Sequence, residues 1–253
     1  MSAVADAMVV AKRNLLRIPR NPDLLLGFTI QPIKFVLLFV YVFGGAIQTG
    51  RLDYVDFLMP GIIVQTMSFG GFVTALSLAD DLSKGLIDRF RSLPMARSAV
   101  LAGRTVADIA TNLISLTTMV VVGVLVGFGF GAPLLHVIAG VLLMVLFGFA
   151  FSWIFAFLGL TSSSPEAAQS LGFVVIFPLT FASSAFVPTE SMPDWLQVFA
   201  DHNPITIVVN ALRHLWVDTP AYNSVWGSVA WCVGIILVFA PLSVSRYRRA
   251  VST

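Results

Sequence analysis

The densest group of charged side chains in this chain lies in residues 80–94. After Asp80 the segment carries five more charged residues, in a chain that is 57% hydrophobic and 11% charged: Asp81, Lys84, Asp88, Arg89 and Arg91. Its apolar residues recur at intervals of four and three, which places them on one face of a helix: Leu82, Leu86, Phe90 and Leu93. Pro94 then ends the helix. Such a helix is suited to docking into a groove on another protein, and the alternative is a solvated loop whose charges only fix orientation.

Nucleotide hydrolysis needs residues that this chain lacks. A P-loop holds phosphate with backbone amides and a lysine that follows glycine, and none of the three lysines follows a glycine. The histidines, His136, His202 and His214, lack the spacing of a metal site, and no G-x-S-x-G segment offers a nucleophilic serine. We therefore expect no catalytic residue, no metal and no cofactor bound by this chain. A membrane-embedded enzyme is disfavoured for the same reason.

An ion-coupled transporter needs ionisable side chains well inside the membrane. Only Lys34 and Asp108 could act as such ion-coupling groups, and both lie near the ends of apolar stretches. Lys34 can extend its ammonium group to the inner interface, and Asp108 can pair with Arg104 one helical turn earlier. Because both have structural explanations, the energy for transport should come from another molecule. A self-contained secondary transporter or channel stays open as the alternative.

The elements that position these residues are membrane-spanning helices. A mean hydropathy of +0.90 and 21 phenylalanines give more apolar surface than one water-soluble core can bury. Five stretches contain no acidic residue, lysine or arginine: 35–50, 57–79, 109–165, 167–189 and 219–245. A span needs about 20 residues, so the third stretch should hold two spans with a turn at Gly127–Pro133. The sequence predicts an all-α integral membrane protein with six transmembrane helices, the first extending back toward Leu24.

Basic residues predict the orientation of these spans. With six spans both termini lie on one side of the membrane, and thirteen of the fifteen lysines and arginines fall on that side. Only Arg51 and Arg213 fall on the other. Since cytoplasmic loops are enriched in lysine and arginine, we expect both termini and residues 80–104 to be cytoplasmic.

The N-terminal segment, residues 1–22, precedes the first span. It mixes apolar residues with Lys12, Arg13 and Arg17, as in an amphipathic helix that lies on an anionic inner leaflet. The alternative is that these charges serve orientation alone. We expect the interfacial helix.

The external stretch before the last span is too polar for a span and too long for a plain connection. Ser191 with Asp194 three residues later indicates the start of one helix, and Asn203 followed by Pro204 the start of another. One face of the second helix is apolar, with Arg213 off that face: Ile205, Val208, Val209, Leu212, Leu215 and Trp216. We interpret the stretch as two re-entrant half-helices in the outer leaflet. Their marker residues are Pro193, Trp195, Asn203, Pro204, Leu212 and Trp216.

In this order the segments resemble the permease subunits of type-2 ABC transporters, most closely the daunorubicin-resistance (DrrB-like) branch. The resemblance covers essentially the whole chain. Its most specific parts are "GLIDRFRSLP" after the second span and "FVPTESMPDWLQVFADHNPITIVVNALR" before the last. Many relatives carry glutamate where this chain has Asp88. The resemblance implies one ABC type-2 transmembrane domain, residues 1–253, with an interfacial helix (1–22), a coupling-helix loop (80–104) and an external re-entrant segment (187–221).

The resemblance also implies a separate motor. In that family the loop after the second span is a coupling helix that sits in a cleft of a cytoplasmic ATPase, and ATP and Mg are bound by that partner. The residues carried over are Gly85, Asp88, Arg89, Arg91, Leu93 and Pro94, to which the apolar stripe adds Leu86 and Phe90. The interfacial helix would rest beside the same ATPase. Expected partners are two ATPase copies, a second permease (this chain or a sister chain) and membrane lipid, without nucleic acid.

Candidate pathway residues are predicted in the second and fifth spans. They are polar or aromatic: Gln65, Thr66, Ser68, Thr74, Phe173, Phe177, Phe181, Ser183 and Ser184. The alternative is that the hydroxyls mediate helix packing and the phenylalanines contact lipid. The sequence thus predicts an exporter permease of a prokaryotic plasma membrane that moves an amphipathic drug-like or lipid-like compound outward. The family also includes polysaccharide exporters.

Overall fold

The computed structural model describes residues 30, 33–44, 52–83, 97–220 and 222–250, and this part of the chain is helical without a strand. Its elements in chain order are η1 (Phe39–Phe43), α3 (Tyr54–Gly70), α4 (Phe72–Ser83), α6 (Arg97–Val126), α7 (Leu134–Thr161), α8 (Pro165–Phe181), η2 (Thr189–Ser191), α9 (Asp194–His202), α10 (Pro204–Val217) and α11 (Tyr222–Ala250). The all-helical class is confirmed. The interfacial helix predicted for residues 1–22 and the coupling residues 85–94 lie outside the described residues.

Four helical segments of the described part are long and apolar enough to cross a membrane. They are Tyr54–Ser83, Asp108–Val126, Leu134–Thr161 and Ser224–Tyr247. Two further helices, Ile33–Phe43 and α8, are apolar but shorter. Large apolar side chains such as Leu125, Leu134 and Leu237 are at least 70% exposed on these helices, as expected for surfaces that face lipid. A membrane-embedded protein is therefore confirmed, and the count of six crossings stays a prediction.

The turn predicted at Gly127–Pro133 is confirmed. Helix α6 ends at Val126 and α7 begins at Leu134, directly after Pro133. Gly127 has a φ of 110°, a conformation that only glycine adopts without strain. The turn is also held from outside, because the amide of Gly129 donates to Oδ1 of Asp56 at 3.0 Å.

The second apolar stretch is helical as predicted, but it divides at Gly71 into α3 and α4. A Cβ at Gly71 would lie 2.2 Å from Cδ2 of Phe155 on α7. The phenylalanine ring therefore occupies the space where a side chain would stand. The interruption is one residue long, at Gly71, and it was not predicted from the sequence.

Helix α7 lies at the centre of the bundle and packs against α3, α4, α6, α8, α10 and α11. Glycines on α7 allow this close packing. A Cβ at Gly159 would lie 2.5 Å from the carbonyl oxygen of Ala75, and one at Gly148 would lie 2.5 Å from Nδ2 of Asn112. Small residues at such contacts are typical of helix packing in membranes.

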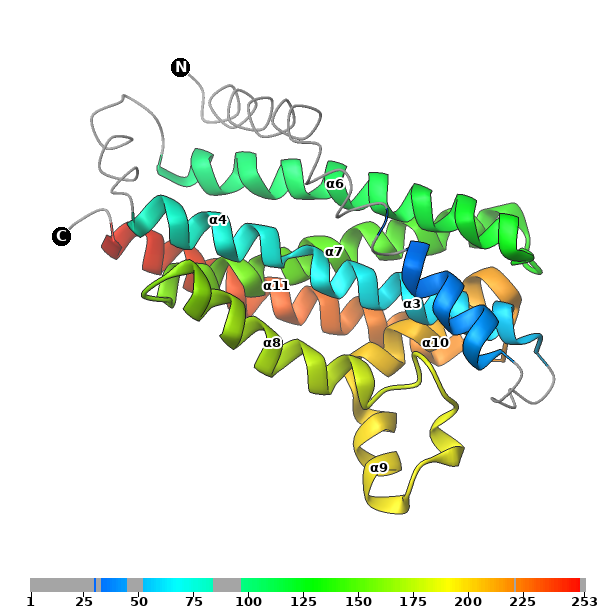
Figure 1. Ribbon diagram of the computed structural model, residues 1–253. Helices are drawn as coiled ribbons and strands as arrows, with labels where there is room; N and C mark the ends of the chain where they lie inside the picture. The colour runs from blue at the N-terminus through cyan, green and yellow to red at the C-terminus, as the bar shows by residue number, and fades with distance from the viewer. Residues whose placement is uncertain (1–29, 31–32, 45–51, 84–96, 221, 251–253) are drawn as a thin grey trace.

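The long helices run roughly side by side, and α9 points away from them (Figure 1). The ends of α4 and α11 and the start of α6 lie at one end of the bundle, opposite the turn between α6 and α7. The polar connection from α8 to α11 lies on the side of that turn. Residues that follow α4 and residues that precede α11 therefore emerge at opposite ends.

Candidate functional site

Helix α8 ends inside the protein, and the chain after it is non-helical but buried. Ser183, Ser184, Ala185 and Phe186 are between 0% and 6% exposed. Non-helical backbone at membrane depth must have its polar groups satisfied by the protein. We call residues 182–187 the α8 break.

Polar side chains of α10 and its N-cap form hydrogen bonds with the backbone of the α8 break and of the last turn of α8. Nδ2 of Asn203 donates to the carbonyls of Leu179 and Ala182 at 2.7 and 2.8 Å, which are free carbonyls at the end of α8. Oγ1 of Thr206 accepts a hydrogen bond from the amide of Ser184 at 3.0 Å. Asn203 also caps its own helix, because its Oδ1 accepts from the amide of Ile205 at 2.9 Å. The start of α10 predicted at Asn203–Pro204 is thereby confirmed.

Arg213 completes this set from the far end of α10, and its side chain is 4% exposed. Its Nε donates to the carbonyl of Phe57 at 3.0 Å, and one terminal nitrogen donates to the carbonyl of Ser184 at 2.7 Å. The other terminal nitrogen donates to Oγ of Ser184 and Oδ1 of Asn210 at 3.2 and 3.1 Å. The guanidinium carbon also lies 3.6 Å from the ring centroid of Phe57. All four acceptors are uncharged oxygens, so hydrogen bonds and the aromatic ring stabilise the cation.

These contacts join three elements into one polar cluster. We call it the Arg213 cluster. It consists of Phe57 on α3, Ser184 in the α8 break, Asn203 at the N-cap of α10, and Thr206, Asn210 and Arg213 on α10. The last four residues are spaced by three, four and three residues, which places them on one helical face. The cluster can hold the α8 break against α3 and α10 and leaves no group free for catalysis. Its chemistry is therefore structural.

Arg213 was predicted to lie off the apolar face of α10, and no contact was assigned to it. The apolar face itself is confirmed, because its members are at most 6% exposed: Ile205, Val208, Val209, Leu212, Leu215 and Trp216. The arginine, which adjoins that face, is buried as well, and this burial was not predicted from the sequence. The regular spacing of Asn203, Thr206, Asn210 and Arg213 was the signal that could have indicated a second buried face.

Ser191 was predicted to cap the first of these two helices, and this prediction was wrong. Helix α9 begins at Asp194 after Pro193 and has no side-chain cap. Ser191 instead ends the short helix η2, and its Oγ donates to the carbonyl of Pro188 at 2.7 Å. Pro193 takes the N-cap position, and Met192 before it is extended, so Ser191 lies too early in the chain to cap the first amides of α9.

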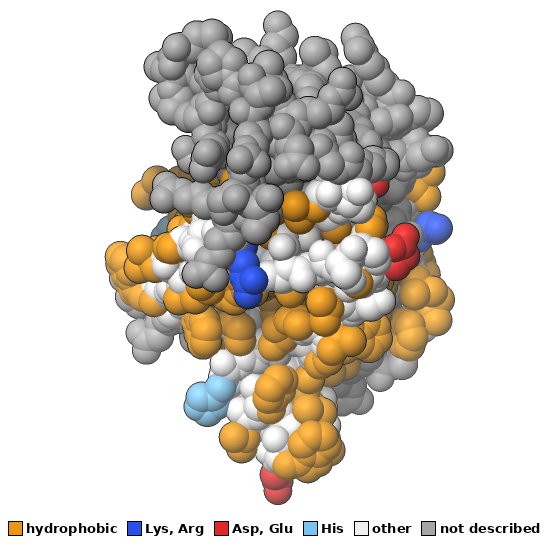
Figure 2. Space-filling model, turned by 90° about the vertical axis from the view of Figure 1, so that its left-hand side faces the viewer, with side chains coloured by type: hydrophobic (Ala, Val, Ile, Leu, Met, Phe, Trp, Pro, Cys, Tyr) orange, Lys and Arg blue, Asp and Glu red, His pale blue; other side chains and the backbone are white. Residues whose placement is uncertain are grey.

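Helix α9 forms an arm at the side of the bundle. Trp195 is 75% exposed, and Val198 and Phe199 one turn further along are also exposed. Figure 2, a view from one end of the bundle, shows the projecting arm with hydrophobic side chains at its surface. By contrast, Leu212 and Trp216 of α10 are fully buried, packed beside Gly140 of α7. The two helices of the external stretch thus have different surroundings.

The candidate pathway residues fall into two groups. The polar ones are mostly buried and several are hydrogen-bonded within the chain: Oγ of Ser68 donates to the carbonyl of Val64 at 2.8 Å, and Oγ1 of Thr74 donates to Oδ2 of Asp108 at 2.7 Å. Gln65, Ser183 and Ser184 are buried and Thr66 is half-buried. The aromatic ones, Phe173, Phe177 and Phe181, are 40–50% exposed on α8.

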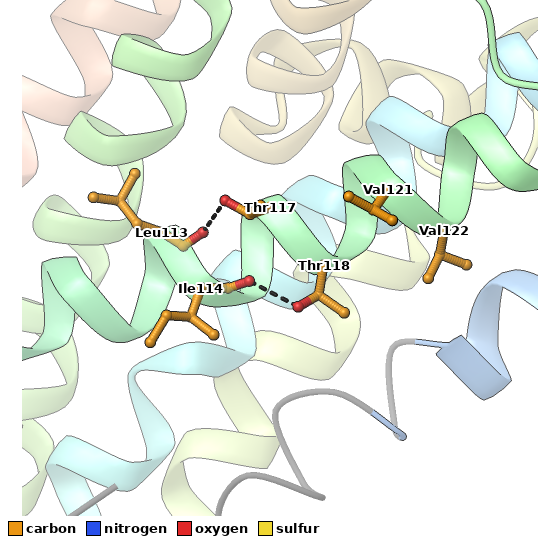
Figure 3. A pocket seen from close by; sticks show the side chains of 6 residues that line it. All are labelled: Leu113, Ile114, Thr117, Thr118, Val121 and Val122. Carbon is orange, nitrogen blue, oxygen red and sulfur yellow. Dashed lines mark hydrogen bonds between the residues drawn. The ribbon is translucent and has the colours of Figure 1, made fainter. Parts of the chain in front are cut away.

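A shallow groove of about 470 Å³ lies along α6, away from these residues (Figure 3). Its lining is Leu113, Ile114, Thr117, Thr118, Val121 and Val122. The hydroxyls of Thr117 and Thr118 donate to the carbonyls of Leu113 and Ile114, one turn earlier, at 2.8 and 2.9 Å. Since the hydroxyls bond to their own helix, the groove presents an apolar surface.

Comparison with known proteins assigns this helical bundle to a family. The model of the ABC-2 type transporter family matches residues 6–216. The chain belongs to this family and is a membrane permease.

Individual relatives narrow this assignment. The chain is 36% identical to the daunorubicin resistance ABC transporter permease protein DrrB1 of Streptomyces coeruleorubidus, over 98% of this chain and 87% of that protein. It is 27% identical to the probable doxorubicin resistance permease protein DrrC of Mycobacterium tuberculosis, over 98% and 90% of the two chains. The probable multidrug permease YbhR of Escherichia coli is 23% identical over 79% of this chain and 54% of its own length.

Gly61 offers a direct test of the packing at the α8 break. A Cβ at Gly61 of α3 would lie 1.9 Å from the carbonyl oxygen of Ala185. We expect Gly61→Ala to push the break away from α3 and to destabilise the fold by about 1–3 kcal/mol, measured as a lower thermal midpoint of the purified permease. Gly234→Ala is the control, because a Cβ there meets no atom within 4 Å. Equal midpoints for the two variants would show that α3 and the break are not packed in this way.

Proposed function

We propose that this chain is the permease half of an exporter that moves amphipathic, drug-like or lipid-like molecules out of a prokaryotic cell. The observation that carries the proposal is its 36% identity, over nearly its whole length, to a permease named for daunorubicin resistance. Family membership supports transport through an ABC system. The apolar and aromatic exposed face of α8 supports a preference for amphipathic compounds.

The energy would come from ATP, with Mg, bound and hydrolysed on a separate cytoplasmic ATPase. Its docking site would be the coupling helix in residues 80–104, with the interfacial helix of residues 1–22 beside it. Helix α4 ends at Ser83, within the first residues of that segment, and packs against α7 and α8. A displacement of the loop would therefore reach α8, which carries the candidate pathway residues Phe173, Phe177 and Phe181.

The membrane topology would be six spans with both termini in the cytoplasm of the cell, in the plasma membrane. The two shorter apolar helices, Ile33–Phe43 and α8, would belong to the first and fifth spans. Helices α9 and α10 would form the external re-entrant pair, with Trp195 and its neighbours on α9 at the outer leaflet. The end of α4 and the start of α11 lie at opposite ends of the bundle (Figure 1), which supports this arrangement.

Two permeases and two ATPases would make the working transporter. One bundle leaves the phenylalanine face of α8 exposed, and Phe177 and Phe181 stack there with ring centroids 4.3 Å apart. A second copy of this chain or a sister permease would enclose a pathway between two such faces. A symmetric pair would use the same surface twice.

ATP-dependent uptake into inside-out vesicles tests the proposal. The chain would be produced together with a candidate ATPase chain, and accumulation of a fluorescent anthracycline would be followed. We expect uptake only when both chains are present and ATP is added, because inside-out vesicles expose the cytoplasmic ATPase to the added ATP. Uptake driven by an ion gradient without the ATPase would instead support a secondary transporter.

A further inference from the structure

The loop expected to dock onto the ATPase is flanked by two helices that share a side-chain hydrogen bond. Helix α4 ends at Ser83 and α6 begins at Arg97. Oγ1 of Thr74 on α4 donates to Oδ2 of Asp108 on α6 at 2.7 Å. We propose that Thr74 and Asp108 are positioning residues for coupled transport, because their hydrogen bond fixes α4 relative to α6 and makes both helices follow a displacement of the loop. This inference rests on the proposed function, in which residues 80–104 receive the movement of an ATPase.

The chemistry of this hydrogen bond suits a contact that transmits force. Thr74 is 1% exposed and Asp108 is half-buried. A bond from a hydroxyl to a carboxylate is shorter and stronger than a bond between neutral groups, and a surrounding of low dielectric strengthens it further. The hydroxyl of Thr74 is thus used to join two helices inside the chain, although Thr74 was predicted as a candidate pathway residue.

Helices α4 and α6 need such a contact because apolar packing does not join them directly. Both pack extensively against α7, and the described contacts between α4 and α6 themselves are few. The end of α4 and the start of α6 nevertheless lie at the same end of the bundle (Figure 1). A hydrogen bond between their side chains can therefore set their relative position where the two helices do not interdigitate.

The contact also lies beside the interruption between α3 and α4. Thr74 follows Gly71 by three residues, and on the other side of Gly71 the chain touches α6 again: a Cβ at Gly70 would lie 2.8 Å from Oδ1 of Asn112. Asn112 is one helical turn after Asp108. Because glycine has the least restricted backbone, the direction of the chain can change at Gly71 at low cost. A shift of α4 about Gly71 would then reach α6 through Thr74 and Asp108, while Asn112 stays against the end of α3.

The amount of substrate moved per ATP hydrolysed, measured for the complex of permease and ATPase, tests this role. Thr74→Val removes the hydroxyl and keeps a side chain of similar size, whereas a change at Asp108 would also remove the predicted pair with Arg104. We expect Thr74→Val to retain its copurified ATPase and to lower the ratio of substrate to ATP by about 3-fold or more. Thr74→Ser keeps the hydroxyl and should restore the ratio.

The matched control is Thr117→Val, the same chemical change on α6. The hydroxyl of Thr117 donates to the carbonyl of Leu113 in its own helix at 2.8 Å, so its removal breaks no bond between helices and should leave the ratio unchanged. Thermal midpoints establish that each variant is folded. A general loss of stability would lower transport and hydrolysis together, whereas loss of the positioning contact changes their ratio.

Distances between spin labels test the positions of the two helices without any ATPase. The labels would be attached after Ser83→Cys at the end of α4 and Ser98→Cys near the start of α6, in a Cys232→Ser background. Labelled permease would be diluted with unlabelled permease, so that only distances within one chain are measured. We expect Thr74→Val to shift or broaden the distance distribution and Thr74→Ser to match the parent protein.

Two results would overturn this inference alone. One is a distance distribution that Thr74→Val leaves unchanged, and the other is an unchanged ratio of substrate to ATP in a complex whose wild type transports. A wild-type complex that moves no substrate when ATP is added gives a different result, because it would overturn the proposed function and the coupling role together. The failure of the inference and the failure of the proposed function are therefore distinguishable.

Discussion

Replacing Arg213 with methionine is expected to destabilise the permease far more than replacing an exposed arginine. The substitution leaves the buried carbonyls of Phe57 and Ser184 without the donors that they have now. Each buried acceptor left without a donor costs about 1–3 kcal/mol, and the cation over the Phe57 ring adds about 0.5–2 kcal/mol. The thermal midpoint of the purified protein and its abundance in the membrane should both fall.

Two further variants make this result specific. Arg246→Met removes an exposed arginine near the end of α11 and should change stability by at most about 0.5 kcal/mol. Arg213→Lys keeps the charge but loses the planar fork that reaches three elements at once, so its midpoint should lie between those of the wild type and Arg213→Met. Equal midpoints for Arg213→Met and Arg246→Met would mean that the cluster adds no net stability.

The position where α8 ends explains why an arginine is buried here. Because α8 stops at Phe181, its last carbonyls and the α8 break need donors from elsewhere in the protein. Nδ2 of Asn203 donates to two of these carbonyls, and Arg213 donates to the carbonyl of Ser184 from the other end of α10. Burying a charge is costly, but one guanidinium can serve α3, the break and α10 together. Ser184 therefore has a structural role that requires no substrate.

Local signals in the sequence were enough to predict several elements. The glycines and proline of Gly127–Pro133 fixed a turn because glycine tolerates a positive φ and proline cannot continue a helix. The helix start at Asn203–Pro204 was predicted correctly because the capping side chain of Asn203 and the amide that it binds, that of Ile205, lie within three residues. The apolar face of α10 followed from helical periodicity alone.

Contacts between distant residues could not be predicted in the same way. The partners of Arg213 come from residues 57 and 184, and no local pattern indicates that folding brings them to α10. The lack of space for a side chain at Gly71 arises from Phe155, a ring contributed by another helix. Ser191 failed as a cap because Met192, the residue before Pro193, is extended, as proline favours in the residue that precedes it. The coupling residues 85–94 stay a prediction from the sequence.

Phe90→Ala should uncouple this permease from its motor, although Phe90 is expected to lie outside the membrane and away from any substrate. Phe90 shares one predicted helical face with Leu86 and Leu93, and aromatic anchors at the centre of an interface often account for much of its binding energy. Loss of such an anchor costs about 2 kcal/mol or more, which is about 30-fold in affinity. The measurement is the amount of ATPase that copurifies with the permease and the hydrolysis that substrate stimulates in reconstituted membranes.

The matched control is Lys84→Ala on the charged face of the same predicted helix. An exposed lysine contributes little to a docked interface, so this variant should retain nearly all of the copurified ATPase. The thermal midpoint of the isolated permease should be the same for both variants, because both residues are predicted to lie in the cytoplasmic loop. A Phe90→Ala variant that binds its ATPase and responds to substrate like the wild type would place the docking surface elsewhere. The charged face of residues 80–94 would then be the next surface to test, beginning with Arg89 and Arg91.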